Sequence, residues 1–158
     1  MRNILGAVGV ATTLLWATPA FACSTPVSVC PNTSDGSFTL IAGGRPATVI
    51  VEAASDSAVR IAADSFAKDL ERVSGTMPRR AADPATATGD VVIAGVLGES
   101  AAIDALVKSG KLSARDLGGR WEAYRQIVVD RPWPGVRRAL IIVGADRRGA
   151  GLGLFDLS

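Results

Sequence analysis

An amphipathic helix between two β-branched segments is the feature that most constrains the fold of this chain. Between Val59 and Val73, apolar side chains recur at i, i+3, i+4 and i+7, the spacing of a helix that buries one face. Residues 47–53 before it and 91–94 after it are compact β-branched runs, which predict buried strands. This order predicts an α/β domain, built as a small mixed β-sheet with packed helices.

The rest of the domain continues the alternation of strands and helices. We expect a short apolar strand over 38–41, a loop over 76–89, a helix over 100–107, a capping-box-like helical turn over 113–116, strands over 122–130 and 138–143, and a helix over 150–158. The short connection between the last two strands predicts an antiparallel hairpin. Because the sequence stops within this last apolar helix, we expect the domain, residues 37–158, to be incomplete at its C-terminus.

The N-terminus has the pattern of an export signal. Arg2 precedes an uncharged run over residues 4–16, and residues 20–22 (Ala-Phe-Ala) match a small-x-small cleavage site. We therefore predict a signal peptide over 1–22, followed by a flexible linker over 23–36. The mature protein is expected to be secreted or periplasmic, with no membrane association after cleavage. An uncleaved membrane anchor is the alternative.

Two cysteines follow the predicted cleavage site, Cys23 and Cys30. An oxidising compartment favours a disulfide between them. The alternatives are two free thiols, or lipidation of Cys23 with Cys30 left free. The geometry of the chain decides between these states, and sequence spacing does not determine it.

Composition excludes several classes of function. The sequence contains no His, which excludes a Ser-His-Asp triad, a Cys-His dyad and any His-ligated metal site. The net charge of +2, from 17 basic and 15 acidic side chains, is not the basic footprint of a nucleic-acid-binding protein. The carboxylates are scattered, without the evident pair that a glycosidase places across the scissile bond. We therefore predict no catalytic residue, no metal site, no cofactor and no nucleic-acid partner.

A glycine-rich loop, Gly144–Gly149, joins the last strand to the last helix and contains Arg147 and Arg148. A loop that leads into a helix can bind an anion through its backbone N–H groups, and adjacent arginines can hold a carboxylate. Arg147 and Arg148 are therefore the candidate substrate-binding residues. The alternative is a tight turn with two solvated arginines.

Aromatic side chains gather around the strand predicted over 122–130. Trp133 lies between two prolines, and we expect it to be exposed. Its ring would then suit a sugar platform, whereas packing in the core or in an interface is the alternative.

The amino-acid sequences of several segments resemble those of a known family. The matching segments are residues 62–75, 92–98, 103–112, 119–124, 134–144, 146–149 and 154–158. Together they resemble the N-terminal domain of glycoside hydrolase family 115, the xylan α-1,2-glucuronidases. The pattern R-G-x-x-x-G-L-F-x-L over 148–157 is also similar to the small α/β domain, domain 2, that precedes the barrel in β-hexosaminidases.

This resemblance implies an accessory domain, or a fragment, of an enzyme that removes (4-O-methyl-)glucuronic acid side chains from xylan. The family's catalytic pocket lies mainly in a downstream barrel, so no catalytic residue is carried over to this chain. The implied partners are that barrel and glucuronoxylan, and the implied place of Arg147 and Arg148 is a domain interface near a uronate carboxylate. The alternatives are a stand-alone carbohydrate- or anion-binding module without hydrolase activity, and a non-catalytic interaction domain.

Overall fold

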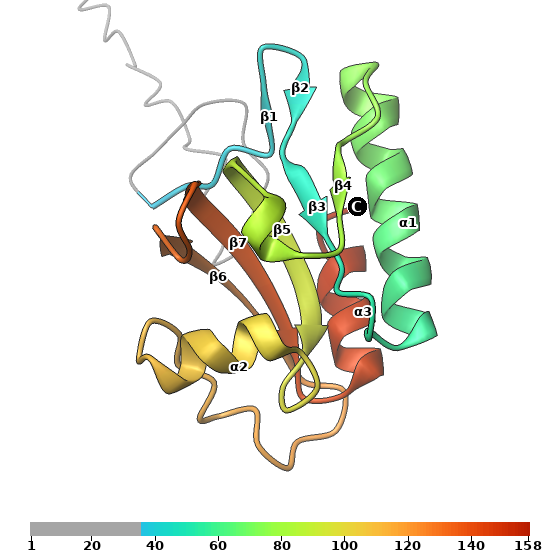
Figure 1. Ribbon diagram of the computed structural model, residues 1–158. Helices are drawn as coiled ribbons and strands as arrows, with labels where there is room; N and C mark the ends of the chain where they lie inside the picture. The colour runs from blue at the N-terminus through green and yellow to red at the C-terminus, as the bar shows by residue number, and fades with distance from the viewer. Residues whose placement is uncertain (1–35) are drawn as a thin grey trace, which may run out of the picture. The chain divides into compact units, whose positions relative to one another are not determined.

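The computed structural model describes residues 36–158, which form a mixed five-stranded sheet with helices on both faces (Figure 1). The predicted small α/β fold is confirmed. The predicted signal peptide, most of the predicted linker, and both Cys23 and Cys30 lie outside the described residues. Within the described range, no helix has the length and apolar character needed to cross a membrane.

The elements follow one another along the chain in nearly the predicted order. The strands are β1 Ile41–Ala42, β2 Arg45–Pro46, β3 Thr48–Ile50, β4 Arg80–Ala81, β5 Gly89–Val96, β6 Tyr124–Asp130 and β7 Val136–Gly144. The helices are α1 Ser57–Ser74, the 3-10 turn η1 Pro84–Thr86, α2 Ala101–Lys108 and α3 Arg147–Phe155.

The strand order in the large sheet is β4-β3-β5-β7-β6. The first four of these strands are parallel, and β6 pairs with β7 in the antiparallel sense. The predicted hairpin over the last two strands is therefore confirmed, with Ile127 opposite Ile141. β1 and β2 form a separate antiparallel ribbon ahead of the sheet.

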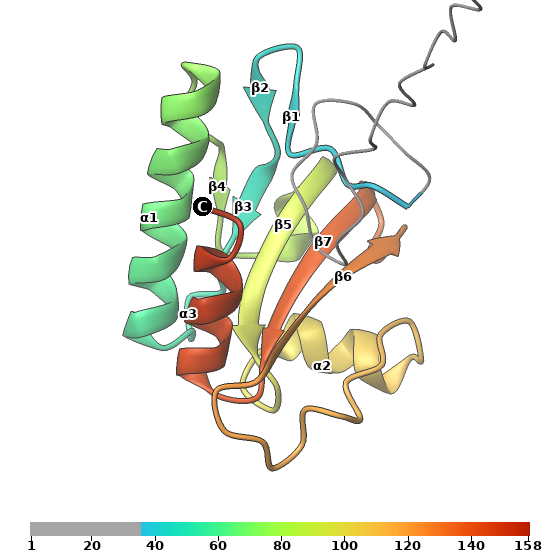
Figure 2. The same cartoon turned by 180° about the vertical axis from the view of Figure 1, so that it is seen from behind.

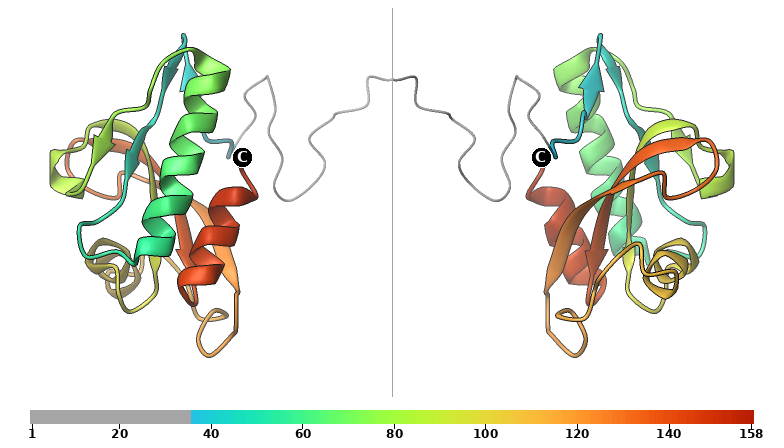
Figure 3. Two further views of the ribbon diagram at one scale, coloured as in Figure 1. Left: turned by 90° about the vertical axis from the view of Figure 1, so that its right-hand side faces the viewer. Right: turned by 90° about the vertical axis from the view of Figure 1, so that its left-hand side faces the viewer.

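The two faces of the sheet form two separate cores. Because side chains alternate along a strand, Val92 and Ala94 of β5 pack towards α1 and α3, together with Ile142 of β7. Ile93 of β5 and Ile141 of β7 pack on the opposite face, where α2 lies. Figures 2 and 3 show α1 and α3 side by side on one face and α2 on the other. The continuous apolar runs of β5 and β7 are thus buried on both sides, as parallel strands in α/β domains are.

The helix predicted from the 59–73 periodicity is α1, and both of its ends are capped. The Asp56 carboxylate accepts a hydrogen bond of 2.7 Å from the Ala58 N–H at the first turn. Gly75 ends the helix in the left-handed conformation, with φ of +74°. The residues on its apolar stripe that are buried include Phe66, which is 1% exposed.

Several predicted elements differ from the structure. The strand predicted over 38–41 is wrong over 38–40, because β1 starts only at Ile41, where it pairs with β2. The loop predicted over 76–89 contains β4, a two-residue edge strand parallel to β3, which is too short to give a periodic signal. The helical turn predicted over 113–116 is wrong: residues 113–114 have no regular structure, and a turn covers 115–119. Instead of capping a helix, the Asp116 carboxylate pairs with the guanidinium of Arg125 at 3.1 Å, and the same guanidinium reaches the Ser113 carbonyl.

The last helix, α3, starts at Arg147 and ends at Phe155. It therefore begins three residues before the predicted range of 150–158 and ends within that range. Its final carbonyl groups accept hydrogen bonds from the residues that follow and from β6. Gln126 donates to the Gly153 carbonyl at 2.8 Å. Burial and the neighbouring Asp156 carboxylate raise the pKa of Tyr124, also on β6. The end of α3 is therefore fastened to the edge of the sheet.

Candidate functional site

The carboxyl ends of β3, β5 and β7 meet at one edge of the sheet, and each of these strands leads into a helix (Figure 1). This edge is where open α/β sheets bind ligands, since loops and helix N-termini converge there. We call it the carboxyl edge. The polar residues that surround it are Glu52, Asp56, Ser100, Glu122, Asp146, Arg147 and Arg148.

Glu52 lies between β3 and β5, the two neighbouring strands whose following helices lie on opposite faces of the sheet. β3 and β5 are neighbours, but α1 follows β3 onto one face and α2 follows β5 onto the other. The Glu52 carboxylate accepts hydrogen bonds from Ser100 Oγ and, at 3.2 Å, from the Ala102 N–H. Ser100 Oγ in turn accepts from the Ile103 N–H. The chain's own carboxylate thus caps α2, and an external anion would have to displace it.

Asp146 holds the start of α3 in the same way. Its carboxylate accepts 2.8 Å hydrogen bonds from the Gly149 N–H and from the Glu122 N–H. These two bonds, reinforced by the Arg148 charge and opposed by slight burial, lower the pKa of Asp146. The carboxylate therefore links the helix start to the segment that enters β6. The loop predicted over Gly144–Gly149 is wrong at its second half: only residues 145–146 connect β7 to α3, and Arg147–Gly149 form the first turn of the helix that Asp146 caps.

Arg147 and Arg148 lie at the carboxyl edge, as the strand–loop–helix pattern predicts, and each has a carboxylate partner. Arg147 Nη1 is 3.6 Å from Asp56 Oδ2, and Arg148 Nη1 is 3.0 Å from Glu122 Oε1. Their side chains are 66% and 65% exposed. Exposed ion pairs of this kind contribute about 0 to 1 kcal/mol, so either guanidinium can exchange its partner at little cost. Their predicted role in substrate binding stays a prediction.

Glu122 also lies at this site, although no sequence pattern predicts its place there. Its Oε1 accepts a hydrogen bond from Trp121 Nε1 at 2.9 Å as well as the contact from Arg148. Its backbone lies in the left-handed region, with φ of +55°, which is unusual for a residue other than glycine. Only the folded chain brings Glu122 next to Asp146 and Arg148, so local pattern could not reveal it.

The exposed tryptophan at this edge is Trp121, with 79% of its surface accessible. The prediction that Trp133 is exposed is wrong. Trp133 is only partly accessible, because its ring packs against the buried apolar residues of the α2-side core.

The carboxyl edge has the chemistry of a structural junction. The carboxylates of Glu52, Asp56 and Asp146 cap helix starts, and Glu122 pairs with Arg148. A glycosidase acid needs a raised pKa to protonate the leaving oxygen, whereas the pKa of Asp146 is lowered. Residues 36–158 also contain no group of acidic or thiol side chains that could hold a metal ion.

No family model matches this sequence, and no curated protein matches it. A solved structure of a family GH115 4-O-methyl-α-glucuronidase, with specificity for decorated arabinogalactans, is similar over 72% of this chain, with a TM-score of 0.56 and 19% identity. The chain has a GH115-like fold. At this identity the likeness shows the fold alone, and the chain spans 13% of the length of that enzyme.

Proposed function

We propose that this chain is an N-terminal accessory domain, or a fragment, of an exported glycoside hydrolase that removes (4-O-methyl-)glucuronic acid side chains from xylan. The observation that carries the proposal is the fold match, in which most of this chain resembles a small part of a GH115 glucuronidase. That enzyme acts on decorated arabinogalactans, so the substrate class is a polysaccharide with uronate side chains. In this proposal the catalytic barrel is the domain's partner, and the signal at 1–22 sends the protein to the periplasm or outside the cell.

Exposed apolar side chains on α3 support a domain that docks on another. Leu152 and Phe155 are 45% and 52% exposed, and they follow Arg148 at helical spacing on one side of α3. Apolar groups gathered on a surface are characteristic of a contact with another protein part. Both ends of α3 are capped, which favours the stand-alone binding module instead. The fold match supports the accessory domain.

Arg147 and Arg148 are proposed to approach a uronate carboxylate at the interface with the barrel. In a full-length enzyme, we expect Arg147→Ala or Arg148→Ala to raise KM for glucuronoxylan about tenfold with kcat unchanged, because a charge-assisted hydrogen bond is lost. Arg60→Ala is the matched control, since Arg60 lies exposed on α1. Steady-state kinetics test this, and an unchanged KM in both variants contradicts a role in binding.

The accessory role itself is tested by the DNA that follows the Ser158 codon. We expect an open reading frame that continues into a barrel domain. The purified 158-residue chain should release no (4-O-methyl-)glucuronic acid from glucuronoxylan or from decorated arabinogalactan, with a full-length enzyme as positive control. A stop codon directly after Ser158 would overturn the accessory role and support a binding module. Release of uronic acid by the chain alone would overturn its non-catalytic character.

A further inference from the structure

A surface hollow lies at the edge of the sheet opposite the carboxyl edge, where α2 ends and the β6–β7 turn begins. Its volume is about 430 Å³, and it is lined by Lys111 and by residues 131–136 of the turn. The hollow is an open depression, so a ligand in it would keep part of its surface in water. We call it the turn hollow.

The backbone around the turn hollow is held in place. Lys111 Nζ donates to the carbonyls of Arg131 and Pro132, at 3.0 and 3.2 Å. The Arg131 N–H donates to the Arg137 carbonyl at 2.8 Å, and the Val136 N–H donates to the Trp133 carbonyl at 3.2 Å. Because these bonds fix the walls, little ordering of the protein is needed when a ligand binds.

The lining of the turn hollow carries positive charge without a balancing carboxylate. Its only ionisable side chains are Lys111 and Arg131. The Lys111 ammonium group has three N–H donors and uses two of them on carbonyls. Within residues 36–158, the Arg131 guanidinium makes neither an ion pair nor a hydrogen bond. One face of this hollow is therefore suited to an anion.

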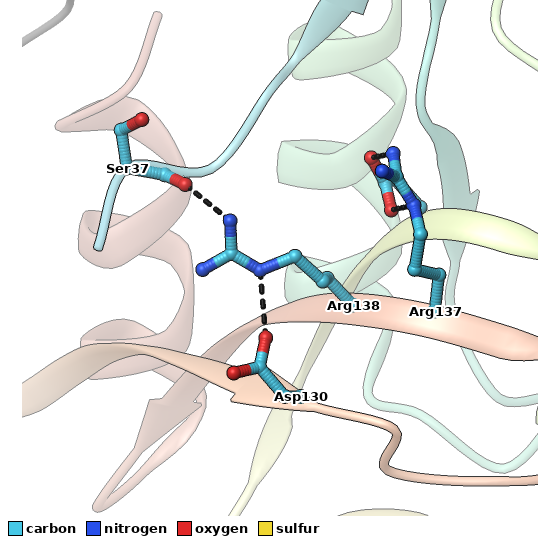
Figure 4. A network of polar contacts seen from close by, with 5 residues as sticks. Ser37, Asp130, Arg137 and Arg138 are labelled. Carbon is cyan, nitrogen blue, oxygen red and sulfur yellow. Dashed lines mark hydrogen bonds and ion pairs between the residues drawn. The ribbon is translucent and has the colours of Figure 1, made fainter. Parts of the chain in front are cut away.

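Arg131 differs from the two arginines at the start of β7, although other exposed arginines of residues 36–158, such as Arg60, also make no ion pair. Arg138 binds the Asp130 carboxylate at 2.7 Å and the Ser37 carbonyl at 2.6 Å (Figure 4). Arg137 forms a bidentate pair with Asp90. Arg131 also lies in the left-handed region, with φ of +46°. Strained backbone of this kind concentrates at functional sites.

Trp133 supplies the other half of the turn hollow. Its ring is partly buried against the core, and it lies between Pro132 and Pro134, which also line the hollow. A ring fixed in this way offers a rigid apolar surface at low entropic cost. A ligand that fits both halves has an anionic group on one side and an apolar face on the other. A hexuronate has both, since the pyranose ring presents C–H groups on its face and carries a carboxylate.

We propose that the turn hollow binds a uronic acid residue, with its carboxylate at Arg131 and Lys111 and its ring against Trp133. The anionic part of the ligand follows from the charges of the hollow, and the choice of a sugar rests on the proposed function. The site would give the domain its own hold on a uronate-bearing polysaccharide, distant from Arg147 and Arg148 at the opposite edge.

The indole N–H resonance of Trp133 in the full chain, followed by NMR, tests the proposal. D-glucuronate should shift this resonance and saturate in the millimolar range, whereas D-glucose, which lacks the carboxylate, should bind about tenfold more weakly. Acetate, which lacks the ring, should also bind about tenfold more weakly. Arg131→Gln and Lys111→Gln should each weaken glucuronate binding about tenfold, and Arg60→Gln on α1 is the charge-matched control.

Three results would overturn the uronate site. The first is a Trp133 resonance that does not respond to glucuronate. The second is an affinity for glucose, or for acetate, equal to the affinity for glucuronate. The third is an unchanged affinity for glucuronate in Arg131→Gln. Each is independent of the reading frame after Ser158. If the Trp133 resonance does not respond and the reading frame continues past Ser158, the uronate site is contradicted and the accessory role stands. If glucuronate binds but a stop codon follows Ser158, the accessory role is contradicted and the uronate site stands.

Discussion

Gly149→Ala should destabilise the domain by about 3 kcal/mol or more, while Gly151→Ala, two residues further along α3, should stabilise it by about 0.5 to 1 kcal/mol. A Cβ at Gly149 would lie 2.3 Å from the Ala123 carbonyl oxygen, which is backbone and cannot rotate away. A Cβ at Gly151 would meet only the Ala62 Cβ, at 3.9 Å. The first contact is a clash, whereas the second is ordinary packing between α3 and α1.

The opposite signs follow from where α3 touches the rest of the domain. At Gly149 the helix start presses on the segment that enters β6, where the Ala145 N–H also donates to the Ala123 carbonyl at 2.8 Å. Relief of the clash would move α3 away from the sheet and break the contacts of Asp146. At Gly151 the larger residue restricts the unfolded chain and favours the helix.

Urea unfolding of the three proteins measures this difference directly. Gly149→Ala should give a lower midpoint or no folded protein, and Gly151→Ala should give a higher midpoint with an unchanged slope. Gly151→Ala thus serves as the control for helix propensity. A Gly149→Ala protein as stable as the wild type would show that α3 does not approach β6 as closely as the structure has it.

The elements that the sequence predicts well are those with a local signal. The stripe of α1, the apolar runs of β5 and β7, and the short β6–β7 turn each specify their structure within a few neighbouring residues. The two-residue β4 and the turns around Ser113 have no such signal, because their conformation depends on partners elsewhere in the fold, β3 and Arg125. The glycines of α3 similarly read as weak helix formers until the approach to Ala123 is known.

The residues of the candidate site also fall into two groups, those that a local sequence pattern can place and those that it cannot. The order strand, glycine loop and helix is sufficient to place Arg147 and Arg148 at the carboxyl edge, since every parallel strand ends there. It is not sufficient to find their partners, Asp56 and Glu122, which arrive from other parts of the chain. The turn hollow is harder still, because Lys111 and Arg131 belong to different loops that meet only in the folded domain.

Asp146→Ala should cost about 2 kcal/mol of unfolding free energy at neutral pH, and less in acid. The substitution removes the N-cap of α3, worth about 0.5 to 2 kcal/mol, together with the hydrogen bond that the Glu122 N–H donates. Both bonds are made to a carboxylate whose pKa in the folded protein lies below its usual value. Since these bonds favour the ionised form, their full strength requires Asp146 to be deprotonated.

The pH dependence follows from the direction of that pKa change. In the unfolded chain Asp146 takes up its proton near pH 4, at about its usual pKa of 3.9, and in the folded chain only at lower pH. Its stabilisation is therefore complete above pH 5 and is lost as the pH falls towards the folded pKa. Urea unfolding from pH 3 to 7 should show the difference between wild type and Asp146→Ala constant near neutrality and shrinking below about pH 4. Asp146→Asn, which cannot ionise but keeps one acceptor oxygen, should lose an intermediate amount. A difference that does not change over this range would mean that the Asp146 charge does not stabilise the start of α3.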